Sequence, residues 1–123
     1  MPTFLLATTS VHTAAAACDY LGGRLTAEDT VMILGVEDGD IDPRDIDDAV
    51  NVARARLVPA TVWTERREGD PATEIFDLAA DIDADEIVLG PHRGDPDEER
   101  SGLGSTASAV AGEAEYPVVV VPA

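Results

Sequence analysis

The residues best suited to chemistry lie in the segment that follows an apolar run at Glu86 to Leu89. The candidate binding residues of this segment are glycines and hydroxyl residues, namely Gly90, Gly94, Gly104, Ser105 and Thr106. Their order predicts a strand, a glycine-bearing loop and an alanine-rich helix, with glycines where backbone N–H groups can approach an anion. The free N–H groups and the dipole at a helix start also favour a phosphate group. The segment is therefore predicted to bind phosphate.

Other reactive residue types give no catalytic prediction. His12 and His92 follow expected strands, but neither has a Ser or Asp partner in a triad-like context. The chain contains no lysine, which excludes a Walker A lysine and a Schiff base. The acidic loop 95–99 could hold a metal, yet it is no more acidic than other segments and is interpreted as a solvated loop. Cys18 lies among alanines and is predicted to be a buried, unreactive thiol.

The charge of the chain narrows the class of partner. The formal net charge is -17, all eight basic residues are arginine, and the acids are spread through the chain. Such acidity is typical of proteins adapted to multimolar salt, where screening removes the self-repulsion. It excludes nucleic acid and an anionic membrane surface as partners, because no basic stripe exists. With no apolar run near 18 residues and no basic signal at Met1-Pro2-Thr3, the protein is predicted to be cytoplasmic.

The hydrophobic pattern predicts one domain, residues 1–123, in which strands and helices alternate. Strands are expected at 3–8, 31–36, 60–64, 86–89 and 118–121, and helices at 13–21, 43–57, 71–82 and 105–113. This alternation predicts an α/β fold with an open parallel five-stranded sheet and helices on both faces. In such sheets ligands bind beyond the carboxyl ends of the strands, where the strand order reverses. The pattern itself leaves that order open.

Two further details concern the third strand and its surroundings. The segment from Arg66 to Asp70 is polar and is interpreted as a turn before the third helix. Trp63 and Phe76 are predicted to lie in the core.

The glycine spacing and three other stretches resemble the universal stress protein family, over essentially the whole chain. That family carries the signature Gly-x2-Gly-x9-Gly-(Ser/Thr) after its fourth strand, and Gly94, nine intervening residues and then Gly104-Ser105 match its second half. The stretches 67–71, 85–90 and 116–121 are similar to the turn before its third helix, its fourth strand and its last strand.

The resemblance implies a strand order of 3-2-1-4-5 and a binding site between the first and fourth strands. The ligand would be ATP or a related adenine nucleotide such as AMP, bound by Thr8, Thr9, Ser10, Val36, Gly90, Gly94, Gly104, Ser105 and Thr106. The glycines would let the backbone approach, and Ser105 and Thr106 would donate to phosphate. Thr8 and Ser10 would flank the adenine or ribose, and Val36 would line the base. A homodimer would form through the strand Val118–Val121.

The chain departs from the family pattern at two positions. The Asp that contacts adenine in the family aligns with Thr8, which carries no charge. Gly90 and Gly94 enclose three residues where the signature has two. In addition, the carboxylates at 95–99 lie beside the expected phosphates, so that binding would need Mg²⁺ or high salt.

Three functions are consistent with the sequence. The first is a stress-response protein that binds an adenine nucleotide and acts as a dimeric regulator. The second is a dimeric scaffold of the same family without a nucleotide, which the extra loop residue and Thr8 favour. The third is a slow ATPase, for which the sequence offers no general base or lysine.

Overall fold

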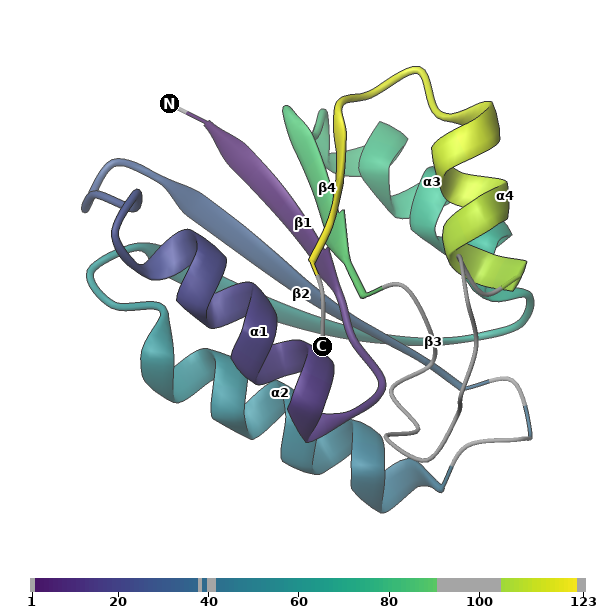
Figure 1. The fold of residues 1–123 in the computed structure, drawn as a ribbon, viewed down its shortest axis with the longest axis horizontal. Coiled ribbons are helices and arrows are strands. Elements are labelled where there is room, and N and C mark those ends of the chain that lie inside the picture. Colours follow the sequence, from purple (N-terminus) through teal and green to yellow (C-terminus); the bar gives the residue numbers. More distant parts are fainter. Residues whose placement is uncertain (1, 38, 40–41, 91–104, 122–123) are drawn as a thin grey trace.

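The structure is a computed structural model that describes residues 2–37, 39, 42–90 and 105–121 (Figure 1). Strands and helices alternate in the order β1 (Thr3–Ala7), α1 (Val11–Gly22), β2 (Thr30–Glu37), α2 (Pro43–Arg56), β3 (Thr61–Glu68), α3 (Pro71–Ile82), β4 (Glu86–Leu89), α4 (Ser105–Glu113) and β5 (Val118–Val120). All neighbouring strands are parallel, and their order is β3-β2-β1-β4-β5. The predicted fold class and the strand order implied by the resemblance are both confirmed.

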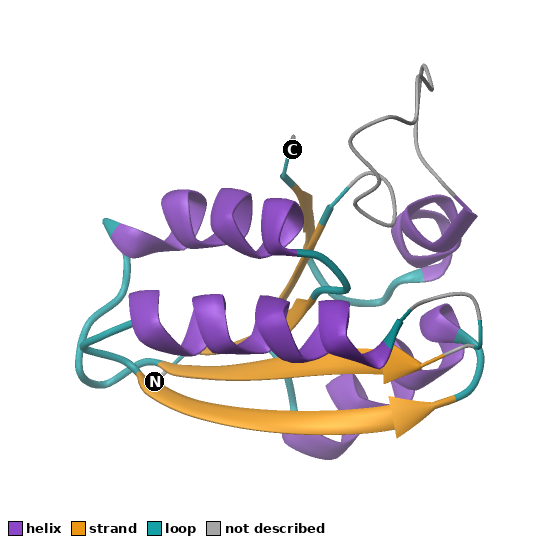
Figure 2. Ribbon diagram, turned by 90° about the horizontal axis from the view of Figure 1, so that it is seen from below, coloured by secondary structure: helices purple, strands orange, loops and turns teal. Residues whose placement is uncertain are grey.

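Two hydrophobic cores lie on opposite faces of the sheet. α1 and α2 lie side by side and enclose the first core, and Figure 2 shows both helices on one side of the strands. α3 and α4 contribute to the second core through Ile75, Leu78 and Val110. Because the central strand β1 is covered on both faces, consecutive residues must be apolar, and Leu6 and Leu5 are fully or almost fully buried in different cores.

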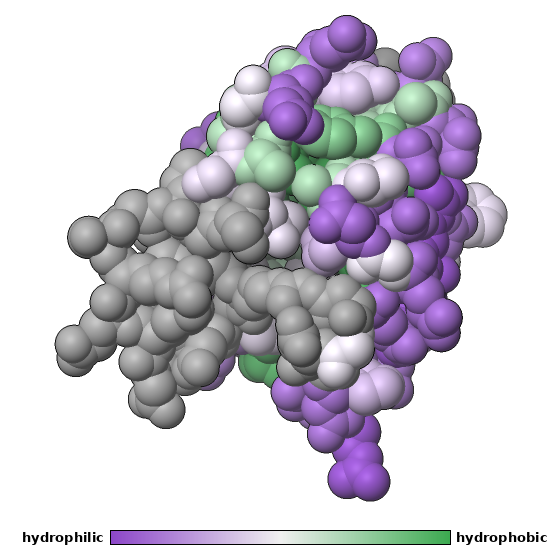
Figure 3. Space-filling model, turned by 90° about the vertical axis from the view of Figure 1, so that its right-hand side faces the viewer, coloured by the Kyte–Doolittle hydropathy of each residue, from purple (hydrophilic) through white to green (hydrophobic). Residues whose placement is uncertain are grey.

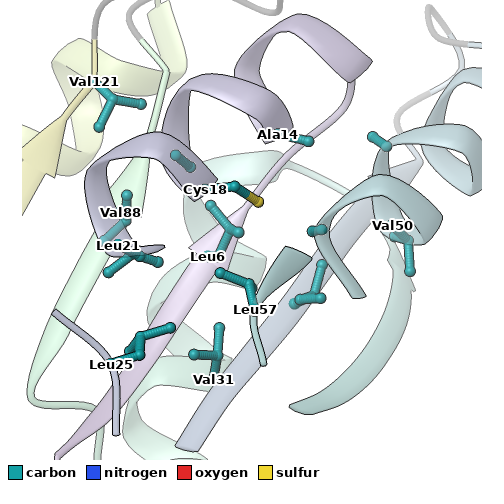
Figure 4. Packing of buried hydrophobic residues seen from close by; sticks show 14 of the residues in the cluster. Leu6, Ala14, Cys18, Leu21, Leu25, Val31, Val50, Leu57, Val88 and Val121 are labelled. Atoms are coloured by element: carbon teal, nitrogen blue, oxygen red, sulfur yellow. The ribbon is translucent and has the colours of Figure 1, made fainter. Parts of the chain in front are cut away.

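The first core can be followed in Figure 4. Leu6 of β1, Leu21 of α1 and Leu57 after α2 lie within one cluster of buried side chains. Cys18 belongs to the same cluster and is 4% exposed. Its burial raises the pKa of the thiol, which agrees with the predicted buried cysteine.

Side-chain caps explain where three helices begin. Asp42 accepts a hydrogen bond from the N–H of Arg44 at 2.9 Å, and Asp70 accepts one from the N–H of Thr73 at 3.1 Å. In both helices a proline occupies the first turn, as predicted. α1 begins at Val11, two residues before the predicted start, because Ser10 is its N-cap.

The third strand is longer than predicted, and the turn predicted from Arg66 onward is wrong. β3 runs to Glu68 and pairs with β2 along its whole length. Two arginines explain why such a polar run is a strand. Arg66 forms ion pairs with Glu37 and Asp47, and Arg67 pairs with acids on both sides of it in the sequence. These ion pairs give the arginine side chains partners within the fold, whereas the sequence pattern alone predicted a solvated turn here.

The prediction that Trp63 lies in the core is also wrong. Trp63 is 60% exposed, and it lies opposite Met32 of β2, which packs against the second core. β3 is an edge strand, and none of its described residues contributes to that core. Trp63 therefore extends beyond the area that the second core covers. Phe76, by contrast, packs against the core as predicted.

The surface matches the acidic composition. Figure 3 shows the side of the molecule that carries α3 and α4, where hydrophilic side chains gather along one border and an apolar area lies beside them. None of the described helices is both long and apolar enough to span a membrane.

Candidate functional site

The strand order reverses between β1 and β4, and the helices that follow these two neighbouring strands lie on opposite faces of the sheet. After β1 it enters α1, which packs in the first core. α4, the next described element after β4, places Ala107 and Val110 in the second core. The residues that follow β1 and β4 therefore lie at the reversal point, where ligands bind in open α/β sheets. We call this place, from Thr8 to Ser10 and at Gly90, the switch point.

Strand register brings the predicted residues of the two strands to the same level. Leu6 pairs with Val88, so the continued register places Thr8 level with Gly90. The N–H of Thr8 also donates to the carbonyl oxygen of Leu34 at 3.1 Å, which continues the pairing with β2. Gly90 is buried. Thr8 and Gly90 therefore both follow adjacent strands at the carboxyl edge of the sheet.

Three hydroxyl side chains form a compact group at the start of α1, which we call the hydroxyl cluster: Thr8, Ser10 and Thr13. The Oγ1 atoms of Thr8 and Thr13 lie 3.0 Å apart, and the Oγ atom of Ser10 lies 3.1 Å from Thr13 Oγ1. Both threonine hydroxyls lie 3.1 Å from the carbonyl oxygen of Ser10. Thr8 and Thr13 are each 3% exposed, whereas Ser10 is half-buried. The cluster therefore exposes Ser10 and encloses both threonines.

The other predicted site residues have different environments. Val36 is 3% exposed and packs in the second core near the end of β2. Thr9 is half-buried after β1, and Thr106 is half-buried in the first turn of α4. Ser105 is the first residue of α4. The predicted Gly94, Gly104 and His92 and the acidic loop 95–99 lie outside the described residues, and His12 is exposed on α1.

The first turns of α1 and α4 carry less negative charge than those of the other two helices. The first turns of α1 and α4 contain no acidic residue, and α1 has a serine cap. α2 and α3 have Asp42 and Asp70 as caps and Asp45 and Glu74 in their first turns. The sequence has no acid before Asp19 and none from 101 to 112. In a chain of net charge -17, the segments 1–18 and 101–112 are thus free of carboxylates, whereas the segment 95–99 between them carries four.

Two arginines near the carboxyl end of β3 attach the strand to the outer helices. Arg66 pairs with Asp47 of α2, and Arg67 Nη2 lies 3.1 Å from Asp81 Oδ2 of α3. Hydrogen bonds to Glu65 and Asp81 raise the pKa of Arg67 further, so it stays protonated. Both arginines are therefore engaged with acids. Among the residues described, no group of His, Cys, Asp and Glu is arranged to hold a metal ion.

Sequence reasoning missed that Thr13 contacts both Thr8 and Ser10. A signal existed, because a Ser followed three residues later by a hydroxyl residue is compatible with a capped helix start. The sequence could not show that Thr8 would turn toward Thr13, since this contact depends on the turn between β1 and α1.

These features define a class of protein: a single α/β domain with an open parallel sheet and a candidate anion site at its switch point. The model of the universal stress protein family matches residues 11–122, and the chain belongs to that family. No curated protein sequence matches the chain.

Several solved structures have the same fold. The hypothetical protein MJ0577 has a TM-score of 0.80 and 22% identity, with 99% of this chain and 96% of that chain covered. A universal stress protein from Archaeoglobus fulgidus in complex with dAMP has a TM-score of 0.64 and 20% identity over 98% of both chains. A family member from Arabidopsis thaliana with AMP bound has a TM-score of 0.67 and 14% identity, with 99% and 92% covered. These are likenesses of fold.

Proposed function

We propose that this protein binds an adenine nucleotide at the switch point and acts as a regulator through that binding, not through turnover. The ligand would be ATP or a related nucleotide such as AMP, with Mg²⁺ as its counter-ion. The glycine loop after β4 and the start of α4 would take the phosphates. The residues after β1 would lie against the sugar or base.

The observation that carries the proposal is the distribution of acids among the helix starts. Acids occur throughout the chain, yet the first turns of α1, which follows the switch point, and of α4 lack them. An acid in a first helical turn is stabilising, and α2 and α3 have such acids. Their absence from α1 and α4 leaves the positive ends of both helices available for a bound anion.

The family and its solved members support the adenine nucleotide as the ligand. The chain belongs to a family of which members have been crystallised with cAMP, AMP and dAMP. All three ligands combine adenine, a sugar and one phosphate group. A hydroxyl cluster at the start of α1 offers neutral donors for such a ligand.

Isothermal titration calorimetry tests the proposal. The purified protein is titrated with ATP, ADP and AMP in molar KCl with Mg²⁺, so that repulsion between the acidic chain and the ligand is screened. We expect heat of binding with at least one nucleotide and a strong loss of that heat in Gly104→Val, which adds bulk where the backbone would approach the phosphate. The absence of heat with all three nucleotides would refute the proposal.

A second function, a scaffold without a nucleotide, is favoured by the burial of Thr8. Its side chain is 3% exposed and turns toward Thr13, away from any ligand. Protein purified without added nucleotide, denatured and analysed by liquid chromatography, separates the two functions when combined with the titration. If the denatured protein releases no nucleotide and the titration shows no binding, the scaffold function is the one that remains.

We also propose that the protein is a homodimer that pairs through β5. This strand pairs with β4 on one side only, and its three valines are half-buried in the described chain. A free edge of apolar residues is a surface that a second strand can extend. Analytical ultracentrifugation in molar KCl should give twice the chain mass of 12.9 kDa. A mass of one chain at micromolar concentration would contradict the dimer.

A further inference from the structure

The hydroxyl cluster restricts where its three protons can point. The carbonyl oxygen of Ser10 accepts the helical N–H of Ala14 at 3.0 Å, which leaves one lone pair for a hydroxyl donor. Thr8 and Thr13 compete for that lone pair, each at 3.1 Å. The threonine that does not donate to it can donate within the cluster, because the two threonine oxygens are 3.0 Å apart.

Both arrangements keep the threonine protons inside the cluster. If Thr13 donates to the Ser10 carbonyl, Thr8 donates to Thr13 Oγ1. If Thr8 donates to the carbonyl, Thr13 donates to Thr8 Oγ1 or to Ser10 Oγ, which lies 3.1 Å away. Either way, Thr13 Oγ1 has a hydrogen bond without the proton of Ser10. Burial of an unsatisfied hydroxyl oxygen is costly, so this condition matters for two side chains that are 3% exposed.

The proton of Ser10 is therefore the one that can turn outward. Ser10 Oγ accepts the N–H of Thr13 at 3.2 Å as the cap of α1, and its own proton remains available. The side chain of Ser10 is also the most exposed of the three. We propose that Ser10 donates this proton to an acceptor atom of the nucleotide, and that Thr8 is a positioning residue that keeps the proton turned outward. This inference rests on the proposed function.

Removal of the Thr8 hydroxyl should reverse the direction of that proton. In Thr8→Val, Thr13 donates to the Ser10 carbonyl, and Thr13 Oγ1 no longer receives a proton from residue 8. Ser10 then supplies its proton to Thr13 Oγ1 and stops donating to the ligand. In Thr13→Val the inward acceptor itself is removed, so the Ser10 proton has no reason to turn inward. The two isosteric variants should consequently differ in nucleotide binding.

The test is titration calorimetry with AMP in molar KCl and Mg²⁺, on the wild type and on variants whose folding is checked by thermal unfolding. The loss of one neutral hydrogen bond corresponds to roughly fivefold weaker binding. We expect that loss in Ser10→Ala and in Thr8→Val, wild-type affinity in Thr8→Ser, and a change of less than about twofold in Thr13→Val. The double variant Ser10→Ala with Thr8→Val should bind no more weakly than Ser10→Ala alone.

The outcomes separate the inference from the proposed function. If the wild type binds none of AMP, ADP and ATP, the proposed function fails and the role of Ser10 fails with it. If the wild type binds but Ser10→Ala or Thr8→Val binds equally well, only the inference is refuted. Additive losses in the double variant refute it too, because Thr8 would then act independently of Ser10. Should Thr8→Val not fold, Thr8→Cys replaces it, since a thiol is a weak donor of similar size.

Discussion

The four helices of this protein start in two different ways. α2 and α3 begin with an aspartate cap, a proline and a further acid in the first turn. α1 begins with a serine cap held in a group of hydroxyls, and neither α1 nor α4 has an acid in its first turn. The first type satisfies the positive end of the helix with charges of the chain itself. The second type leaves that end uncompensated.

This difference follows the position of the helices relative to the switch point. The helices with acidic starts follow β2 and β3, and the helices without acids follow β1 and β4, between which the strand order reverses. Helix stability alone would favour an acid at every start. In the proposed function, these two exceptions leave room for a ligand that brings its own negative charge.

The largest expected effect concerns the region of the acidic starts. A Cβ atom at Gly35 would collide with Ile46 Cγ2 of α2 and lie 3.2 Å from Cδ of Arg66, which pairs with Asp47 of that helix. We expect Gly35→Ala to lower the free energy of unfolding by about 2 kcal/mol through overpacking. Urea denaturation measures this free energy. Gly112→Ala on α4 is the matched control, because nothing lies within 4 Å of its Cβ position, and it should not destabilise the protein.

Converting the serine start into an aspartate start tests the comparison directly. Ser10→Asp keeps a capping acceptor, so the thermal stability should be maintained, but it adds a negative charge at the switch point. We expect AMP to bind at least tenfold more weakly, which equals about 1.4 kcal/mol. Titration calorimetry in molar KCl measures this change. Unaltered affinity would mean that the absence of acids at α1 is unrelated to a ligand.

The reverse experiment concerns the cap of α3. Asp70 accepts hydrogen bonds from the N–H and the hydroxyl of Thr73, at 3.1 and 2.9 Å. Asp70→Ala should lower the free energy of unfolding by about 1 kcal/mol, as is typical for loss of a cap. Nucleotide affinity should not change. A loss of affinity in this variant would show that acidic and acid-free helix starts do not have separate roles.

The smallest expected effect concerns the exposed side chain of Trp63 on the edge strand β3. Because Trp63 is 60% exposed, Trp63→Ser should change the free energy of unfolding by less than about 0.5 kcal/mol. In the wild type, acrylamide should quench the fluorescence of this single tryptophan readily. Quenching as weak as that of a buried indole would contradict the exposure of Trp63.

The alternation of apolar runs with helical spacing predicted the fold, because each run is long enough to be distinctive. The end of β3 could not be predicted in this way, since Arg66 and Arg67 are strand residues only through partners distant in sequence, such as Asp47 and Asp81. The prediction that Trp63 is buried was wrong for a related reason. The order of strands and helices in the sequence does not reveal how far the second core extends over an edge strand.

The candidate site was predicted in part. Thr8, Ser10 and Gly90 follow the adjacent strands β1 and β4, as the predicted order of elements requires, and their part in binding stays a prediction. That Thr8 turns inward onto Thr13 depends on the local geometry of the turn before α1, which residue types alone do not specify. The ligand roles of the nine predicted residues remain predictions.

The central position of β1 has a consequence for the order of events during synthesis. β1 precedes both of its partner strands in the sequence, and it needs Thr30–Leu34 along one edge and Glu86–Val88 along the other. Its backbone N–H and C=O groups toward β4 therefore stay unpaired until Glu86–Val88 have been made. Pairings so distant in sequence slow folding and expose nascent chains to aggregation. The nascent protein is expected to be most vulnerable in this interval.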